Sequence, residues 1–151
     1  MKKKSKLFSM VYSITQAVIS LHLKIFSKNR EHSRYLNWYC NVNFGGNTEY
    51  NDGFSYENWG GYNLLVKLNQ RNPEVQNYIC DVIRFWVAEF DVDGIRLDAA
   101  DVLDFDFMRA LRRTAAEVKE DFWLMGGSDP WRLQQMGKWR NAPQCNKLCP
   151  A

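Results

Sequence analysis

Arg96 and Asp98 are the residues whose types and spacing point most directly to chemistry. They lie two positions apart in the short segment 93–98, where alternation puts Ile95 and Leu97 on one face of an expected strand and the charged pair on the other. Parallel α/β proteins place reacting groups at the carboxyl ends of strands, and a nearby guanidinium favours the ionised carboxylate that a nucleophile needs. From these two residues alone, an ordinary ion pair is the commoner explanation.

Helices and strands alternate around this pair. A helix is expected over 73–90, with Asn72 as its cap, and a second over about 105–118, with Asp104 as its cap. Strands are expected at 93–98 and 122–125. The alternation predicts a parallel sheet, which both α/β barrels and open doubly wound sheets contain, so it does not choose between them. The first helix has its apolar residues at Val75, Tyr78, Ile79, Val82, Ile83, Trp86 and Val87.

The segment from Glu31 to Tyr62 is rich in Asn, Gly and aromatic residues and has neither helical nor strand periodicity. We expect a long irregular loop. Loops of this length are usually functional coverings or disordered, and the aromatic residues argue against disorder. An ordered surface near a cleft is therefore expected, although packed cores use aromatic rings more often than sugar-binding sites do.

Two motifs carry a resemblance to a known family. The stretch DGIRLDAA, residues 93–100, resembles the strand-4 signature of the α-amylase family, glycoside hydrolase family 13. Upstream, Val66–Asn69 and Asn72–Val75 resemble the KLN and NPEV segments of its neopullulanase and maltogenic-amylase branch. Together the motifs indicate membership more specifically than either does alone. After Asp98 that branch often has Asn-Glu, where this chain has Asp101 and Val102, so the subsite preference stays open.

The resemblance implies a fold, a reaction and a set of residues. The fold is α/β, a fragment of a TIM (β/α)8 barrel with about strands 3–5 and helices 3–4. Such enzymes cut α-glucosidic bonds with retention, which requires a nucleophile. In the strand-4 motif, Asp98 matches the position of that nucleophile and Arg96 matches its arginine partner. Trp59, Tyr62 and Asp101 are the expected substrate-binding residues, and an α-glucan or maltooligosaccharide is the expected ligand. No cofactor is expected: calcium occurs in the family, and the Asn and Asp residues of the loop only suggest such a site.

A retaining glycosidase needs a second carboxylate about 5–5.5 Å from the first, as acid and base. The family has a Gly-Glu pair after its fifth strand, whereas Gly126 is followed here by Gly127. Asp129 is shorter and displaced along the chain, so a turn role is expected for it. We therefore expect a chain derived from an α-glucan hydrolase that is catalytically incompetent, or alternatively a noncatalytic glucan-binding or non-functional fragment.

Both ends of the chain differ from the family text, and the genetic code offers an explanation. Regrouping allowed codons from Gly127 onward, by one base, converts the sequence after Gly126 into EVIHGDYSRW, which restores the missing Glu. The opposite regrouping from Ser9 gives DGVFNH, the strand-3 motif. We hypothesise that residues 1–30 and 127–151 are out-of-frame segments flanking a partial catalytic barrel at 31–126. Two genuine but divergent ends are the alternative.

Composition is that of a globular domain: 46% hydrophobic and 25% charged residues in 151, with a net charge of +3. The small charge predicts no nucleic-acid partner. No membrane partner is expected, because the apolar stretch after the basic start is interrupted and too short to span a bilayer. The parent branch suggests a cytoplasmic protein, and the signal-like start leaves secretion as the alternative. Open sheet edges predict self-association.

The cysteines Cys40, Cys80, Cys145 and Cys149 match no zinc pattern and are expected to be reduced thiols.

Overall fold

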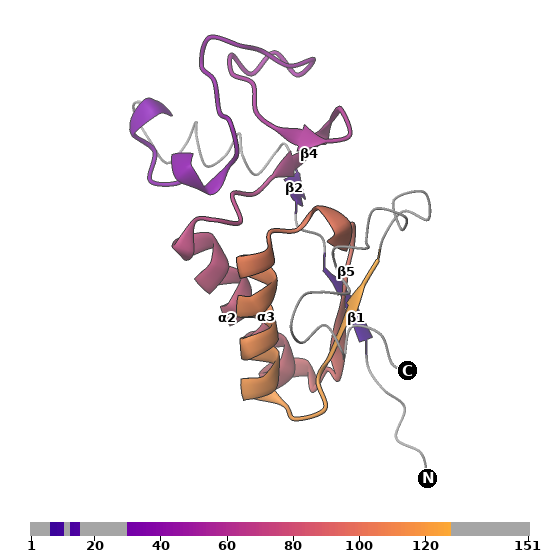
Figure 1. Cartoon of the computed structure of the whole chain (residues 1–151). Helices are drawn as coiled ribbons and strands as arrows, with labels where there is room; N and C mark the ends of the chain where they lie inside the picture. Colours follow the sequence, from indigo (N-terminus) through magenta and orange to yellow (C-terminus); the bar gives the residue numbers. More distant parts are fainter. Residues whose placement is uncertain (1–6, 11–12, 16–29, 128–151) are drawn as a thin grey trace. The chain divides into compact units, whose positions relative to one another are not determined.

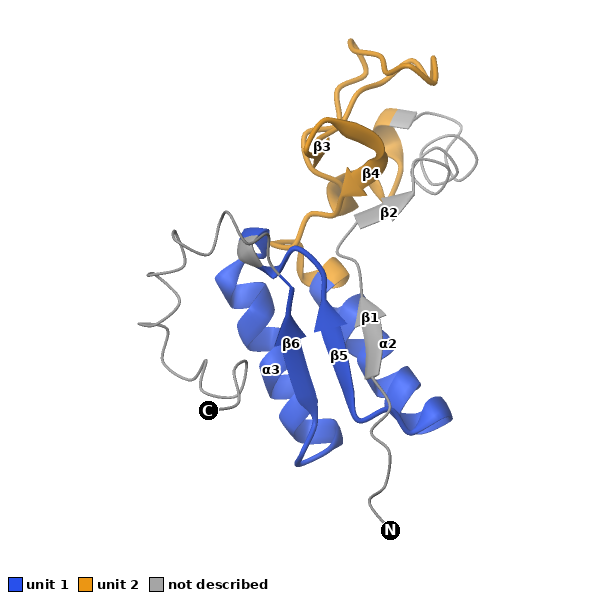
Figure 2. Ribbon diagram, turned by 90° about the vertical axis from the view of Figure 1, so that its right-hand side faces the viewer, with its two compact units in different colours: residues 1–11, 76–151 blue, residues 12–75 orange. Residues whose placement is uncertain are grey.

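A computed structural model of the chain describes residues 7–10, 13–15 and 30–127 (Figure 1). The chain divides into two compact units, residues 1–11 with 76–151 and residues 12–75 (Figure 2). The signal-like stretch lies largely outside the described residues, as do Asp129, Cys145 and Cys149. Within the described part, no helix is both long and apolar enough to cross a bilayer.

The first unit contains a three-stranded parallel sheet. Its strands are β1 (Leu7–Met10), β5 (Gly94–Leu97) and β6 (Trp123–Gly126), in the order β1-β5-β6. Both pairings are parallel and in register, with Leu97 opposite Met10 on one side and Gly126 on the other. The strands expected at 93–98 and 122–125 are therefore confirmed, and each of their ends differs from the expected one by a single residue. The β1 strand is new, because residues 7–10 belong to the stretch that the sequence analysis treated as signal-like or out of frame.

Helices α2 (Pro73–Phe90) and α3 (Phe105–Val118) confirm the two expected helices. Asn72 Oδ1 accepts a hydrogen bond from the Glu74 amide at 2.9 Å, which satisfies a free N–H of the first turn of α2. Asp104 caps α3 by accepting from the amides of Asp106 and Phe107. Both helices lie on the same face of the sheet in Figures 1 and 2.

The buried core between sheet and helices comes from alternate strand residues and one helix face. Ile95 and Leu97 of β5 are buried, as are Phe107 and Leu111 of α3 and Leu124 of β6. The expected direction of the β5 side chains is thus confirmed.

Part of the expected apolar stripe of α2 is wrong. Tyr78 is 55% exposed, whereas Cys80, which was left out of the stripe, is buried. A helix turns by about 100° per residue, so positions 78 and 80 lie at opposite margins of a stripe through Val75 and Ile83, each about 100° from its centre, and the packing of the helix rather than the spacing decides which is buried. An amphipathic tyrosine tolerates such a marginal position because its hydroxyl can remain in water.

The second unit contains an antiparallel sheet of order β2-β4-β3. Its strands are β2 (Ser13–Thr15), β3 (Asn58–Trp59) and β4 (Tyr62–Lys67), and two short 3-10 helices precede β3 at η1 (Arg30–His32) and η2 (Leu36–Trp38). The expected long loop is confirmed for most of 33–57, but it ends in a hairpin. Strands β2, β3 and β4 were not predicted from the sequence, since β2 pairs with residues distant in sequence and only one of the six residues of β4 is buried.

The KLN and NPEV motifs fasten the loop to the start of α2. The side-chain amides of Asn69 and Asn72 each donate to the Asn37 carbonyl at 3.0 Å. The Trp38 indole N–H donates to Glu74 Oε2 at 2.9 Å, and the Asn69 amide donates to the Trp38 carbonyl at 2.7 Å. We call these contacts the Asn37 staple. The motif residues thus hold the η2 segment in place.

Candidate active site

The carboxyl edge of the parallel sheet carries the Arg96–Asp98 pair. Asp98 follows Leu97, the last residue of β5, so it stands at the edge where parallel α/β proteins gather reacting groups. The Arg96 Nη2 and Asp98 Oδ1 atoms are 3.0 Å apart, and the two side chains are 42% and 48% exposed. This geometry is a charge-assisted contact that leaves the carboxylate accessible from solvent.

The backbone around the pair is held by hydrogen bonds between the ends of β5 and β6. The Gly127 amide donates to the Leu97 carbonyl at 2.7 Å, and the Ala100 amide donates to the Gly127 carbonyl at 2.7 Å. Between them Ala99 adopts a left-handed conformation with φ 46° and ψ 45°. A non-glycine residue in this region costs on the order of 1–3 kcal/mol, and such residues gather at functional sites.

Gly127 makes room for the guanidinium. A Cβ atom at this position would lie 2.5 Å from Arg96 Nη2 and 2.9 Å from Arg96 Cζ. Gly126 and Leu97 are partners in the strand register, so Gly127 stands across from Asp98. The sequence places Gly127 where the family has a Glu, but it gives no sign that the Arg96 side chain takes up that space.

The expected substrate-binding residues fall in different parts of the chain. Trp59 and Tyr62 are brought together as a stacked pair in the second unit. Asp101 lies in the 3-10 helix η3 (Ala100–Val102) of the first unit, and its side chain is outside the described residues.

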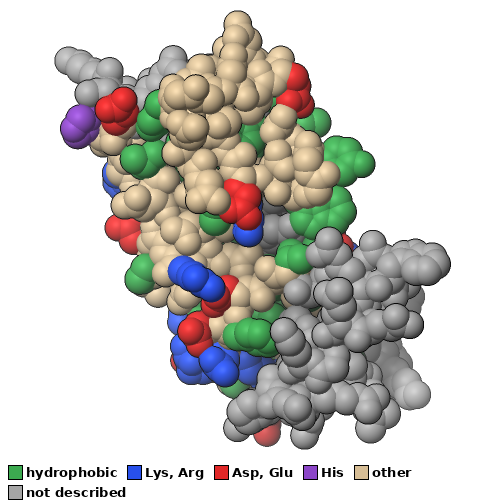
Figure 3. Space-filling view, turned by 45° about the horizontal axis from the view of Figure 1, so that its top comes forward, with side chains coloured by type: hydrophobic (Ala, Val, Ile, Leu, Met, Phe, Trp, Pro, Cys, Tyr) green, Lys and Arg blue, Asp and Glu red, His purple; other side chains and the backbone are tan. Residues whose placement is uncertain are grey.

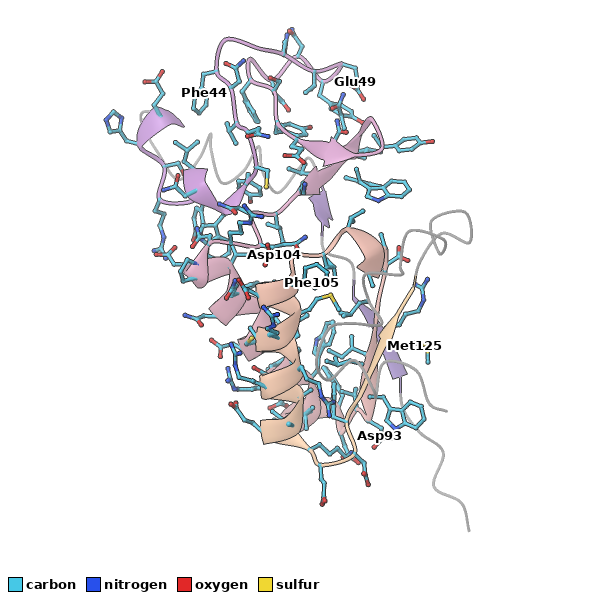
Figure 4. All side chains as sticks on the ribbon, viewed as in Figure 1. Phe44, Glu49, Asp93, Asp104, Phe105 and Met125 are labelled. Atoms are coloured by element: carbon cyan, nitrogen blue, oxygen red, sulfur yellow. The ribbon has the colours of Figure 1, made fainter. Side chains whose placement is uncertain are left out.

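The opposite edge of the sheet has its own charge cluster. Lys119 Nζ lies 3.0 Å from Asp91 Oδ1 and 2.6 Å from Asp93 Oδ1. The hydrogen bonds to Asp93 and Asp91, in that order, raise the pKa of Lys119 above its ordinary value. Figure 4 shows Asp93 at the end of the unit away from Asp104, so this cluster is structural and separate from the carboxyl edge.

Other charges on the described surface are mixed. Arg84 pairs with Asp81 and Glu117, and Arg109 pairs with Asp106. The face in Figure 3 has Lys and Arg side chains beside Asp and Glu side chains. Among the residues that the structure describes, no three His, Cys, Asp or Glu side chains are grouped to hold a metal ion.

Among the described residues, Cys40 and Cys80 are free cysteines. Cys80 is buried and Cys40 half-buried. Burial, and then the neighbouring Glu57 carboxylate, raise the pKa of the Cys40 thiol. A raised pKa lowers the thiolate fraction, so Cys40 lacks the activation of a catalytic cysteine.

Comparisons with known proteins agree on one family. The intracellular maltogenic amylase of Bacillus subtilis (strain 168) is 34% identical over 108 residues, which are 69% of this chain and 18% of that protein. The cyclomaltodextrinase of Geobacillus thermopakistaniensis (strain MAS1) is 36% identical over 99 residues, 66% of this chain and 16% of that protein. The chain therefore spans less than a fifth of the length of these curated relatives.

Solved structures share the fold. The native debranching enzyme of Nostoc punctiforme superposes with a TM-score of 0.66 at 24% identity, covering 85% of this chain and 27% of that one. This match confirms the expected fold class, a fragment of a TIM barrel. The family model described as "Alpha amylase, catalytic domain" matches residues 19–146, a range that starts before residue 31 and ends after residue 126. By this match the chain belongs to the α-amylase catalytic-domain family.

Proposed function

We propose that this chain derives from a retaining α-glucan hydrolase in which Asp98 is the sugar-attacking nucleophile and Arg96 its positioning partner. The observation that carries the proposal is the Asp98 carboxylate just beyond the carboxyl end of β5, exposed and 3.0 Å from Arg96 Nη2. In the barrel, β1, β5 and β6 correspond to strands 3, 4 and 5, with α2 and α3 as helices 3 and 4. The names of the relatives favour α-glucans or maltooligosaccharides as substrates and a cytoplasmic location.

The chemistry follows from the geometry of the pair. A carboxylate oxygen of Asp98 bonds to the anomeric carbon while the glycosidic oxygen leaves with the electron pair of the broken bond. The Arg96 guanidinium lies 3.0 Å from Asp98 Oδ1, and this ion pair favours one direction of the attacking group. A sugar alkoxide is a poor leaving group, so this step needs a proton from a second carboxylic acid.

The chain provides no carboxylate at the position where the family places this acid. Gly126 ends β6 opposite Leu97 and Gly127 follows it, and neither has a side chain. Loss of one member of a catalytic pair costs orders of magnitude in rate. The chain is therefore incompetent toward unactivated glucans.

α-Maltosyl fluoride tests the nucleophile and the missing acid separately. Fluoride departs without a proton donor, so attack by Asp98 needs no second carboxylate. We expect the chain to release fluoride, to retain a maltosyl group detectable by intact-mass spectrometry, and to leave starch and pullulan uncut. Asp98→Asn should abolish the release. Asp106→Asn is the matched control, because Asp106 is an exposed carboxylate paired with Arg109.

Two results would contradict the proposal. Fluoride release that is equal in Asp98→Asn and the parent chain, or absent from both while circular dichroism reports a folded protein, would remove Asp98 as the nucleophile. Reducing sugar formed from starch, and lost in Asp98→Asn, would instead disprove the incompetence and indicate an acid supplied from elsewhere.

The out-of-frame origin of residues 1–30 and 127–151 is a further part of the proposal. It is supported by the two family motifs that the codon regroupings restore, one on each side of 31–126. The coding DNA tests it directly. Codons that cannot be regrouped into DGVFNH and EVIHGDYSRW would leave two genuine, divergent ends as the explanation.

A noncatalytic glucan-binding role is the second candidate. The exposed stack of Trp59 and Tyr62 favours it, because aromatic rings line sugar-binding sites and this stack does not depend on Asp98.

A further inference from the structure

The backbone where β5 and β6 end departs from a regular parallel ladder. Leu97 and Gly126 are the last partners in the strand register, so Asp98 and Gly127 would form the next pair. The bonds of a parallel ladder are evenly spaced, and a residue that bonds through both its backbone groups joins the two neighbours of its partner. A regular continuation would therefore join Gly127 to Leu97 and Ala99.

The observed hydrogen bonds pass over one residue. The Gly127 amide donates to the Leu97 carbonyl at 2.7 Å, as in a regular ladder, but the Gly127 carbonyl accepts at 2.7 Å from the Ala100 amide. Asp98 and Ala99 thus both lie opposite Gly127, which is the arrangement of a β-bulge. A bulge bends its strand and redirects a side chain, and bulges are common beside active sites. We call residues 98 and 99 the Asp98 bulge.

The bulge depends on an unusual backbone conformation at Ala99. Its φ of 46° and ψ of 45° lie in the left-handed region. A Cβ atom makes this region unfavourable, and Gly, Asn and Asp adopt it more readily than Ala. The left-handed turn brings the Ala100 amide to the Gly127 carbonyl, so the hydrogen bond on the far side of Asp98 depends on it.

Close packing holds the far side of the bulge. Ala100 is 1% exposed, and a Cβ at Gly126 would lie 3.0 Å from its Cβ, so the absence of that side chain lets the two backbones approach. The Leu103 amide donates to the Ala100 carbonyl at 3.3 Å, and Leu103 is itself buried. The Asp98 side chain lies between two anchored positions and is 48% exposed. The direction of its carboxylate is therefore set by the backbone of the bulge together with the Arg96 contact.

We propose that Ala99 is a positioning residue, whose left-handed backbone directs the Asp98 carboxylate for its attack on the sugar. The reaction rests on the proposed function, whereas the bulge rests on the Gly127 hydrogen bonds and the Ala99 dihedral angles. A nucleophile displaced by about 1 Å can lose about a hundredfold in rate, so the backbone that carries it affects the reaction without touching the substrate. If Ala99 only started the 3-10 helix η3, a change there would lower stability and leave the rate alone.

A substitution series at Ala99 separates backbone conformation from side-chain size. Asn and Val are similar in volume, but Asn adopts the left-handed region whereas a β-branched residue there is an outlier. The assay is the single-turnover burst of fluoride release from α-maltosyl fluoride. Ala99→Val should lower its maximal rate constant by between about tenfold and a hundredfold, with little change in the donor concentration that gives half the maximal rate. Ala99→Asn should keep most of the parent rate.

Asp91→Val is the matched control for backbone strain. Asp91 has the same φ of 46° and lies in the same unit, at the opposite edge of the sheet from Asp98. Both Val variants should lower the urea midpoint, but only Ala99→Val should slow the burst. Residue-resolved hydrogen exchange reports the bulge without any donor sugar, because the Ala100 amide should be protected in the parent and lose its protection in Ala99→Val.

Several results would overturn the positioning role of Ala99. Equal bursts in Ala99→Val and the parent would do so, as would equal losses in Ala99→Val and Asp91→Val. Equal losses in Ala99→Asn and Ala99→Val would assign the effect to side-chain size. An unprotected Ala100 amide in the parent would disprove the bulge itself.

Two further outcomes keep the test decisive. If Ala99→Val does not fold, Gly126→Ala replaces it, because the added Cβ would press on Ala100. A slower burst in Gly126→Ala then supports the positioning role, and an unchanged burst overturns it. No release from a parent whose Ala100 amide is protected counts against Asp98 as the nucleophile and removes the role of Ala99, but leaves the bulge standing.

Discussion

The Arg96–Asp98 contact depends on the absence of a side chain at Gly127. A Cβ atom at position 127 would stand only 2.5 Å from Arg96 Nη2, which is too close for both atoms to keep their places. The guanidinium is the far end of a flexible side chain, so it can move aside without disturbing the sheet. Restoring any side chain at 127 therefore changes the direction in which Arg96 points.

We predict that Gly127→Ala displaces the guanidinium and slows fluoride release from α-maltosyl fluoride several-fold. The free energy of unfolding should change by less than about 1 kcal/mol, because exposed ion pairs contribute little to stability. Urea unfolding and fluoride release measure the two effects. Gly45→Ala is the control, since its Cβ would meet only Asn43 Oδ1 at 3.3 Å. Unchanged release in Gly127→Ala would argue that Arg96 does not position Asp98.

Lys119 gives the first unit a pH dependence of known sign. Hydrogen bonds to Asp93 and Asp91 raise its pKa in the folded state. The contribution to stability is therefore fully present below the ordinary lysine pKa of about 10.4 and is lost as pH rises through the folded value. We predict that Lys119→Met lowers the urea midpoint near pH 8 and that this difference shrinks as the pH rises above the ordinary lysine pKa of about 10.4 and through the raised folded value. A difference that is constant with pH would contradict a stabilising role for the Lys119 charge.

At the scale of elements, the Asn37 staple attaches the loop to the residues at the start of α2. Asn72 has two functions there, because its Oδ1 caps the first turn of α2 and its Nδ2 donates to the Asn37 carbonyl. The NPEV motif is thus explained by helix initiation and loop attachment, without a catalytic role.

We predict that Asn72→Ala lowers the free energy of unfolding by about 1–2 kcal/mol, from the lost cap and one lost hydrogen bond. Asn72→Asp should recover the cap but lose the donor to Asn37, giving an intermediate value. Asn77→Ala, at an exposed position of the same helix, is the control and should be close to neutral. Urea unfolding followed by circular dichroism measures all three. Equal effects of Asn72→Ala and Asn77→Ala would contradict the staple.

At the scale of the whole molecule, the parallel sheet has two unpaired edges and one exposed face in the described part of the chain. In the described part, no strand pairs with the outer edge of β1 or of β6. Trp123 and Met125 are 48% and 40% exposed, and Figure 4 shows Met125 on the side of β6 away from the helices. Parallel sheets are normally covered on both faces, so this face and the edges are aggregation-prone.

We therefore predict concentration-dependent self-association, visible as a rising weight-average mass in analytical ultracentrifugation. Met125→Lys should reduce it, because a charge on the open face opposes apolar contact. Asn77→Lys adds the same charge at an exposed polar position of α2, so it is the control and should leave the self-association unchanged. A concentration-independent monomer with a sharp melting transition would contradict the prediction.

The elements that the sequence predicted well are those with local causes. The caps Asn72 and Asp104 and the helical spacing of apolar residues placed α2 and α3, because capping and amphipathicity are read within one or two turns. The hairpin could have been found in the same way. Gly60 and Gly61 between two aromatic residues are a turn signal that the sequence analysis passed over.

The sequence alone determined the family, the strand that bears Arg96 and leads to Asp98, and the glycine where an acid is expected, since all three are properties of short stretches of residues. Only the tertiary structure decided that residues 7–10 pair with β5, that Arg96 fills the space beside Gly127, and that the rings of Trp59 and Tyr62 stack in the open. Strand pairing and side-chain packing bring together residues that are far apart in the chain. No local sequence pattern specifies which distant strand will form the hydrogen bonds of a given strand.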